Sequence, residues 1–81
     1  MSLTVQYFAR YREALGLDSE ELAASFASLA EVREHLLARG AAWQVLAEPG
    51  LMCARNQELC SLAEPVQDGD ELAFFPPVTG G

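Results

Sequence analysis

Residues 28–40, SLAEVREHLLARG, predict the one long helix of this chain. Ser28 and Glu31 have the spacing of a capping box, in which the two residues satisfy free backbone N–H groups at a helix start. Gly40 follows as a typical C-terminal stop. Apolar residues recur at helical spacing on one face of the segment, namely Leu29, Val32, Leu36 and Leu37. A helix with one apolar stripe packs on a second layer, so we expect the flanking segments to form a sheet.

Two strand-like segments precede the helix. Residues 2–9 place Leu3, Val5 and Tyr7 on one face and Ser2, Thr4 and Gln6 on the other. Residues 20–26 alternate again, with Leu22, Ala24 and Phe26 on one side. Between them, residues 10–15 predict a short helical turn that ends at Gly16. We expect the two strands to pair antiparallel.

Three further strands are predicted after the helix. Residues 51–62 predict a hairpin around Asn56-Gln57, and residues 71–75 predict the last strand. A short helical turn over residues 41–47 and a turn-rich connector over residues 65–70 complete the chain. This order favours an α+β, β-grasp fold, a mixed sheet with one main helix packed on one face and short helical turns. The first and last strands are expected to lie parallel and adjacent in its middle.

Size and charge restrict the class of protein and its partners. The chain has 81 residues, which suffices for one domain, and a formal net charge of −7, with five arginines and no lysine. An acidic surface repels phosphate groups, so we expect no nucleic acid or membrane partner and favour a protein with a basic surface. No apolar run approaches the ~20 residues that cross a bilayer, and the N-terminus shows no signal-peptide pattern. We therefore expect a soluble, cytoplasmic protein.

No residue set in the sequence suggests catalysis or metal binding. Cys53 and Cys60 are separated by seven positions, which matches no metal-ligand spacing, and His35 is expected on a solvated helix face. The carboxylates around Asp68-Gly69-Asp70-Glu71 are typical of a turn. We expect no bound metal or cofactor. The chain is inferred to carry a reactive group, with the acid–base residues supplied by a partner enzyme.

Three large apolar residues fall on the face that points away from the helix-covered core. Strand alternation places Phe8, Leu59 and Phe75 there, and Phe8 and Phe75 should be close if the first and last strands are neighbours. An exposed aromatic cluster of this kind usually marks a protein interface. The alternative is that strand bends bury one or more of them. Arg12 could add an ionic contact at the rim or could be a solvated surface residue.

The C-terminal residues carry the main functional signal. Pro76 and Pro77 end the last strand, because proline lacks an N–H donor, and we divide the chain there into a domain (1–77) and a flexible tail (78–81). The tail reaches about 14 Å if extended. Gly80 and Gly81 have no Cβ and fit a narrow channel, so an activating enzyme could reach the terminal carboxylate. The alternative is a disordered end without function.

The chain resembles the small subunit of molybdopterin synthase over its whole length. The resemblance is carried by Tyr7-Phe8-Ala9-Arg10 with Arg12-Glu13, by Asn56-Gln57, and by residues 68–81, DGDELAFFPPVTGG. It implies a ubiquitin-like β-grasp fold. It also implies a sulfur carrier in molybdenum cofactor biosynthesis, whose C-terminal glycine is adenylated with ATP and then converted to a thiocarboxylate. The carrier is then a non-catalytic subunit of a sulfurtransferase.

The resemblance also implies partners and site residues. The large synthase subunit uses the sulfur to convert cyclic pyranopterin monophosphate into the dithiolene of molybdopterin, in a complex of two large and two small subunits. An ATP-dependent adenylyltransferase and a sulfur donor protein are the other implied partners. Gly81 matches the thiocarboxylated residue and Gly80 its channel-fitting neighbour. The matching interface positions are Phe8, Arg12, Leu59, Phe75, Pro76, Pro77, Val78 and Thr79.

The hairpin departs from the family pattern at Cys53, Arg55 and Cys60. A two-residue loop at Asn56-Gln57 would pair Arg55 with Glu58 and place the cysteines opposite each other. We expect a surface charge pair for the first and reduced thiols in buried packing for the second; a redox role of the thiols is the alternative.

Three other functions stay open at this point. A thiamine-type sulfur carrier shares the fold and tail chemistry. A ubiquitin-like modifier forms isopeptide bonds, although a chain without lysine cannot build lysine-linked polymers of itself. A plain interaction module with an inert tail is the third.

Overall fold

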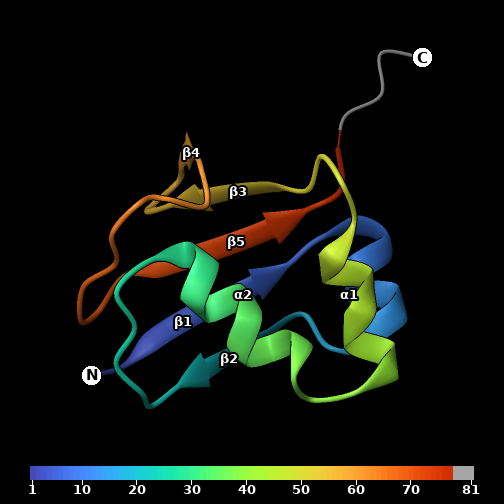
Figure 1. Ribbon diagram of the computed structural model, residues 1–81, viewed down its shortest axis with the longest axis horizontal. Helices are drawn as coiled ribbons and strands as arrows, with labels where there is room; N and C mark the ends of the chain where they lie inside the picture. The colour runs from blue at the N-terminus through green and yellow to red at the C-terminus, as the bar shows by residue number, and fades with distance from the viewer. Residues whose placement is uncertain (78–81) are drawn as a thin grey trace.

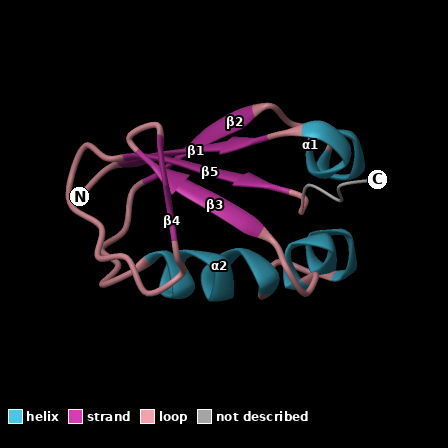
Figure 2. Cartoon of the chain, turned by 90° about the horizontal axis from the view of Figure 1, so that it is seen from above, coloured by secondary structure: helices cyan, strands magenta, loops and turns pink. Residues whose placement is uncertain are grey.

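The computed structural model describes residues 1–77, and the predicted tail residues Val78, Thr79, Gly80 and Gly81 lie outside this range. Five strands form one mixed sheet in the order β2-β1-β5-β3-β4, and helix α2 crosses one face of it (Figures 1 and 2). The elements are β1 (Leu3–Tyr7), α1 (Ala9–Leu15), β2 (Ser19–Leu22), α2 (Leu29–Leu37), the 3₁₀ helix η1 (Ala41–Ala47), β3 (Met52–Arg55), β4 (Glu58–Cys60) and β5 (Glu71–Phe75). The predicted β-grasp arrangement is confirmed.

The two ends of the sequence pair at the centre of the sheet. Strands β1 and β5 run parallel with Val5 opposite Leu72, while β2 and β3 join them antiparallel on either side. In β1 and β5 buried and half-buried residues alternate strictly, as the period-two pattern predicted. The sheet therefore offers one apolar face to α2 and leaves the other open.

The predicted capping box starts the main helix. The Oγ of Ser28 accepts a hydrogen bond from the backbone N–H of Glu31 (3.4 Å), and Glu31 Oε1 accepts one from the N–H of Ala27 (3.2 Å). Leu29, Val32 and Leu36 are fully buried against the sheet, whereas Leu37 packs at its margin. No helix within residues 1–77 is long and apolar enough to span a membrane.

The predicted second strand was too long. Pairing with β1 stops at Leu22, so Ala24 and Phe26 are not strand residues. The Phe26 ring packs edge-on against His35 of α2, with centroids 5.2 Å apart. Phe26 is therefore apolar because it packs on the helix, and not because it belongs to a strand. His35 itself is exposed, as expected.

The first strand also ends earlier than predicted. Ladder pairing stops at Tyr7, and Phe8 is the extended residue that precedes α1. Ala9 then takes a positive φ of 53°, which turns the chain out of the sheet. The expected stop at Gly16 is confirmed, since this residue is left-handed at φ 69° and donates its N–H to the carbonyl of Arg12.

The hairpin forms as predicted, but its charge pair does not. Asn56 and Gln57 both have positive φ, which is the geometry of a two-residue hairpin turn, and Arg55 lies opposite Glu58 in the ladder. The guanidinium of Arg55 turns instead to Asp70 (Nε to Oδ2, 2.7 Å) and to Glu64 (3.3 Å). Asp70 is 7% exposed, so pairing there also satisfies a buried carboxylate.

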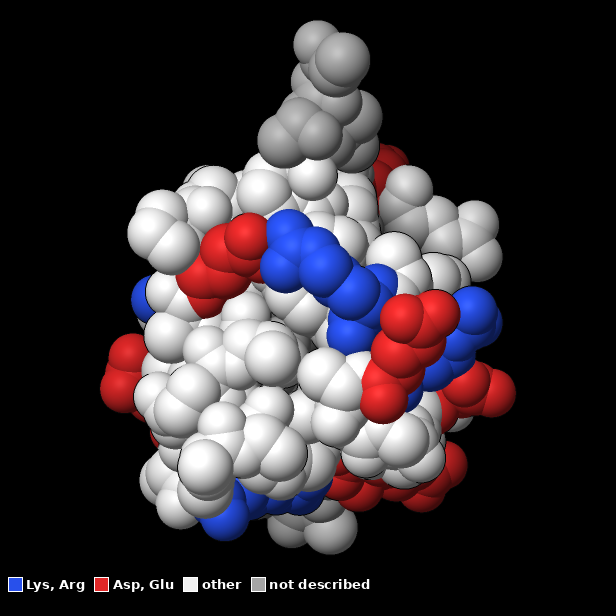
Figure 3. All heavy atoms as spheres, turned by 90° about the vertical axis from the view of Figure 1, so that its right-hand side faces the viewer, with Lys and Arg blue, Asp and Glu red and all other residues white. Residues whose placement is uncertain are grey.

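Basic side chains meet acidic ones at the opposite end of the molecule as well. Figure 3 views the end formed by α1 and η1, where blue and red side chains lie next to each other. Arg10 of α1 pairs with Glu48, which follows η1, at 2.7 Å. On the edge strand β2, Glu20 pairs with Arg39 at 2.8 Å and accepts a hydrogen bond from the Tyr7 hydroxyl at 2.8 Å.

Candidate functional site

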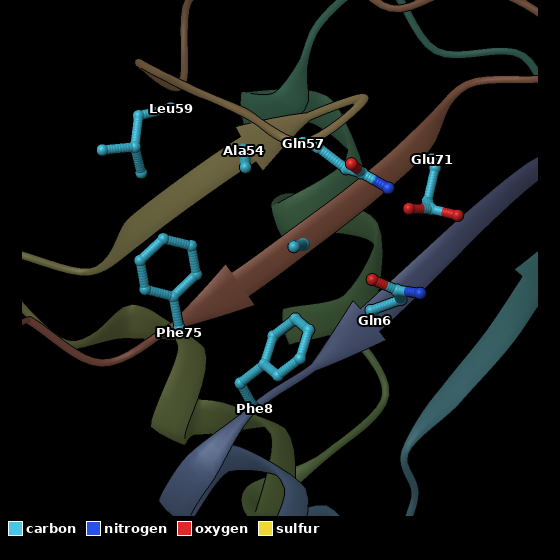
Figure 4. A pocket seen from close by; sticks show the side chains of 8 residues that line it. Gln6, Phe8, Ala54, Gln57, Leu59, Glu71 and Phe75 are labelled. Atoms are coloured by element: carbon cyan, nitrogen blue, oxygen red, sulfur yellow. The ribbon is translucent and has the colours of Figure 1, made fainter.

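The open face of the sheet carries a shallow groove of about 260 Å³. Its apolar end is made by side chains from the residue that follows β1, from the end of β5 and from the short strand β4 (Figure 4). Its other end is polar. The lining residues are Gln6, Phe8, Ala54, Gln57, Leu59, Glu71, Ala73 and Phe75.

An aromatic pair forms the apolar end of the groove. Phe8 and Phe75 stand edge to face with ring centroids 6.4 Å apart. Phe8 is 42% exposed and Leu59 67%, while Phe75 is half-buried. The prediction that these three residues point away from the core is confirmed, and bends do not bury them. An exposed cluster of this kind is typical of a surface that another protein covers.

Small residues create the hollow between these side chains. Ala54 of β3 lies opposite both Ala73 of β5 and Leu59 of β4 in the ladders. The methyl groups of Ala54 and Ala73 form the bottom of the groove, and the larger side chains that line it surround them. The sequence showed both alanines, but only the register brings them together.

The polar end of the groove was missed from the sequence. Gln6, Gln57 and Glu71 line it, although they belong to three separate segments. Glu71 was predicted to begin the last strand, and the carboxylate cluster that it forms with Asp68 and Asp70 in the sequence was attributed to a turn and not to a site. The structure separates them, because Asp68 accepts a hydrogen bond from the N–H of Ser2 at 2.7 Å, while Asp70 binds Arg55. The alternation of β5 was the available signal, since it places Glu71 on the same face as Phe75.

Arg12 does not line the groove. Its exposed side chain lies on α1 with Nε 3.7 Å from an Asp18 oxygen, a weak surface contact. The structure thus brings Phe8, Leu59 and Phe75 together and leaves Arg12 outside the groove. Pro76 and Pro77 follow Phe75 directly and are half-buried.

Cys53 is a core residue, and the half-buried Cys60 packs against the core. Cys53 and Cys60 face each other across the hairpin as predicted, both thiols are free, and the Cys53 Sγ donates to the carbonyl of Cys60 at 3.3 Å. Burial, with a smaller contribution from Cys60, raises the pKa of the Cys53 thiol to about 12, so it is a poor nucleophile. Within residues 1–77 no cluster of three His, Cys, Asp or Glu side chains could hold a metal ion.

Comparison with known proteins gives the family. Residues 5–81 match the model of the ThiS family, which is nearly the whole chain. The chain belongs to the ThiS family. This family match includes the four C-terminal residues that the structure does not describe.

Two relatives of this ThiS-family chain are named molybdopterin synthase sulfur carrier subunit. The one from Escherichia coli is 46% identical over 80 residues, covering 98% of this chain and 99% of the relative. The one from Haemophilus influenzae is 49% identical over 80 residues with the same coverage. The resemblance inferred from the sequence is confirmed, and with it the sulfur carrier type.

Solved structures confirm the ubiquitin-like fold of this family member. SAMP1 from Haloferax volcanii superposes with a TM-score of 0.82 at 27% identity over all of both chains. A protein–protein complex of subunits 1 and 2 of molybdopterin-converting factor from Helicobacter pylori contains a chain with a TM-score of 0.69, also at 27% identity over all of both chains.

Proposed function

We propose that this chain is the sulfur-carrying small subunit of molybdopterin synthase and that its working group is the carboxylate of Gly81. The position of the groove carries the proposal. Phe75 lines the groove, and Pro76-Pro77 follows at once. A partner that covers the open sheet face therefore also meets the start of the tail.

The proposed chemistry begins with activation of the tail. An adenylyltransferase joins the Gly81 carboxylate to the AMP part of ATP, and pyrophosphate leaves. Sulfur released from a donor protein at the oxidation level of hydrosulfide, with a thiol as the reductant, then displaces AMP and leaves a thiocarboxylate. Gly80 has no side chain, which lets the terminus enter two successive active sites. ATP is thus consumed by the activating enzyme, and the carrier holds no resident cofactor.

The proposed acceptor is the large synthase subunit, in a complex of two large and two small subunits. Phe8, Leu59 and Phe75 form the docking surface, and residues 76–79 form the entrance segment. Arg12 lies on α1 outside the groove, and we assign it to the rim of the interface. The net charge of −7 favours a partner with a basic surface.

The reaction is proposed to occur in the large subunit. There two carriers in turn each pass one sulfur to cyclic pyranopterin monophosphate, which builds the dithiolene of molybdopterin, and water returns each Gly81 to a carboxylate, with acid–base residues supplied by the large subunit. Two free thiols, facing each other without a disulfide, fit the reducing cytoplasm in which we place the protein.

A ubiquitin-like modifier is the second candidate, because SAMP1, small archaeal modifier protein 1 of Haloferax volcanii, superposes on this chain with a TM-score of 0.82. A modifier would join Gly81 to an amine of another protein, whereas a carrier ends as a thiocarboxylate. A thiamine-type carrier would form the same thiocarboxylate and differs only in its acceptor. The acceptor therefore distinguishes all three functions.

One variant tests the role of the terminus. Adding one alanine after Gly81 moves the carboxylate beyond its proposed position, so molybdopterin formation with the large subunit should be lost. Affinity for the large subunit should change less than about twofold, since the groove is untouched. Turnover retained by the extended chain would contradict insertion of the tail.

A further inference from the structure

Two acidic residues of this chain are held in the same way at different places. Glu48 accepts hydrogen bonds from Arg10 (2.7 Å) and from the Tyr11 hydroxyl (2.8 Å). Glu20 accepts them from Arg39 and from the Tyr7 hydroxyl, both at 2.8 Å. Each carboxylate therefore joins an arginine and a buried tyrosine. Their surroundings differ, because only Glu48 begins the segment that runs beside Pro77.

Residues 48–51 connect η1 to β3 and run beside the end of β5. Met52 lies opposite Phe75 in the antiparallel ladder, so the same register places Gly50 opposite Pro77. The two residues are close together, since a Cβ placed on Gly50 would lie at ordinary van der Waals distance, 3.5 Å, from the Cβ of Pro77. Gly50 has a φ of +84°, a conformation that glycine adopts without strain.

Pro77 lies two residues beyond the last ladder pair of β5, which is Phe75 with Met52. Proline has no backbone N–H, so neither Pro76 nor Pro77 can donate to a strand ladder. Beyond Phe75 the chain must be oriented largely by packing. The 48–51 segment supplies such packing, and its own position is fixed at Glu48, whose carbonyl accepts the N–H of Leu51 at 3.2 Å.

Glu48 in turn is fixed to α1 through both carboxylate oxygens. Arg10 holds Oε2 and the fully buried Tyr11 holds Oε1, while the Arg10 guanidinium lies over the Tyr11 ring, 5.7 Å from its centroid. Figure 2 shows the end of β5 directed between α1 and η1. The Glu48 side chain thus joins α1 to the segment that follows η1, and the end of β5 is directed between these two elements.

We propose that Glu48, bound by Arg10 and Tyr11, is a positioning residue that holds Gly50 against Pro77 and so fixes the direction in which the tail leaves the fold. This inference rests on the proposed function, since direction matters only if the terminus must enter a partner. A misdirected tail lowers the rate of the chemical step, because even ~1 Å of misplacement can cost up to about 100-fold in rate. Docking through the groove is unaffected, since Glu48 does not line it.

Glu20 provides a matched control. Glu48→Ala and Glu20→Ala each remove a carboxylate bound by one arginine and one tyrosine, but Glu20 lies on the edge strand β2 and makes no contact with residues 48–51 or 77 among its hydrogen bonds and ion pairs. Relaxation of ¹³C-labelled proline in the full chain reports order at Pro77. Pro65, in the connector before β5, serves as an internal reference.

The expected result is a lower order parameter at Pro77 in Glu48→Ala, with Pro65 unchanged and with Glu20→Ala like wild type. With the large subunit, Glu48→Ala should slow single-turnover sulfur transfer about tenfold and change Kd less than about twofold. Wild-type order and rate in Glu48→Ala, or equal losses in Glu20→Ala, would overturn the inference. Should Glu48→Ala not fold, Glu48→Gln against Glu20→Gln gives the same comparison. If wild type itself transfers no sulfur, the proposed function fails, and the proline measurement still decides the role of Glu48.

Discussion

Phe8 and Phe75 pack edge to face on the sheet surface that α2 leaves open, with their ring planes at 84°. The backbones of the two segments are also joined, since the N–H of Phe8 donates to the carbonyl of Phe74 at 3.2 Å. The last residue of β5 is therefore both part of the groove and the start of the chain exit. Docking and presentation of the tail depend on the same few residues.

Replacing Phe75 with aspartate should weaken binding of the large subunit. The change puts a charge into the centre of an apolar contact, and central aromatic residues of interfaces are worth about 2 kcal/mol or more, about 30-fold in Kd. Isothermal titration calorimetry measures the effect. Phe26→Ala is the control, because Phe26 is also a half-buried aromatic but contacts His35. Unchanged affinity in Phe75→Asp would remove the groove from the interface.

Leu59→Ser should separate binding from stability. Since Leu59 is 67% exposed, we expect the free energy of unfolding to change by less than about 0.5 kcal/mol while partner affinity falls. Leu72→Ala, at a fully buried position of β5, should instead cost about 2–5 kcal/mol. Urea denaturation compares the two. A large loss of stability in Leu59→Ser would mean that this side chain supports the fold.

The stability of the chain should fall in acid, partly because of Asp70. Burial by itself raises the pKa of this carboxyl, but hydrogen bonds from Arg55, the Gln67 backbone and Asn56 outweigh it and leave the pKa below its ordinary value. The unfolded chain therefore binds the proton first, at about pH 4, and the stabilisation is present above that pH and lost as pH falls through the lower folded pKa.

Asp70→Asn tests this assignment. The free energy of unfolding of the variant, measured from about pH 3 to 6, should depend less on pH than that of wild type. A residual slope is expected, because Arg10 and then Tyr11 also lower the pKa of Glu48. Identical slopes in the two proteins would contradict the role given to Asp70.

The two thiols should be free but slow to react. Burial raises the pKa of both, and Cys53 is only 2% exposed, so at about pH 8 neither is appreciably ionised. In the native protein a disulfide reagent should modify Cys60 slowly and Cys53 more slowly still. In denaturant without reductant both should react at once. Finding no free thiol there would show a disulfide between them.

Local patterns predicted most of the fold. The capping box at Ser28, the alternation around Val5 and Leu72, and the Asn56-Gln57 turn each depend on neighbours in sequence, so they could be recognised without a structure. The outward direction of Phe8, Leu59 and Phe75 followed from period two alone. The predicted extent of the second strand was wrong, because Phe26 continues the alternating pattern in the sequence but packs on His35 of α2 in the structure.

Contacts between distant segments could not be predicted. Arg55 forms an ion pair with Asp70 and not with its ladder neighbour Glu58. A buried carboxylate such as that of Asp70 is unstable without a partner, whereas an exposed one is solvated by water. The pairing of Arg10 and Tyr11 with Glu48 likewise joins residues nearly 40 positions apart. The polar end of the groove appears only when β1, β5 and the hairpin turn are set side by side.

The central claim is that the Gly81 carboxylate becomes a thiocarboxylate, and intact-mass spectrometry tests it most directly. The full chain is incubated with ATP, its activating enzyme and a sulfur source, and a parallel sample lacks ATP. The account predicts a mass increase equal to exchange of one oxygen for one sulfur, located by fragmentation at Gly81 and absent without ATP. An unchanged mass, or a chain joined through Gly81 to amines of other proteins, would contradict it.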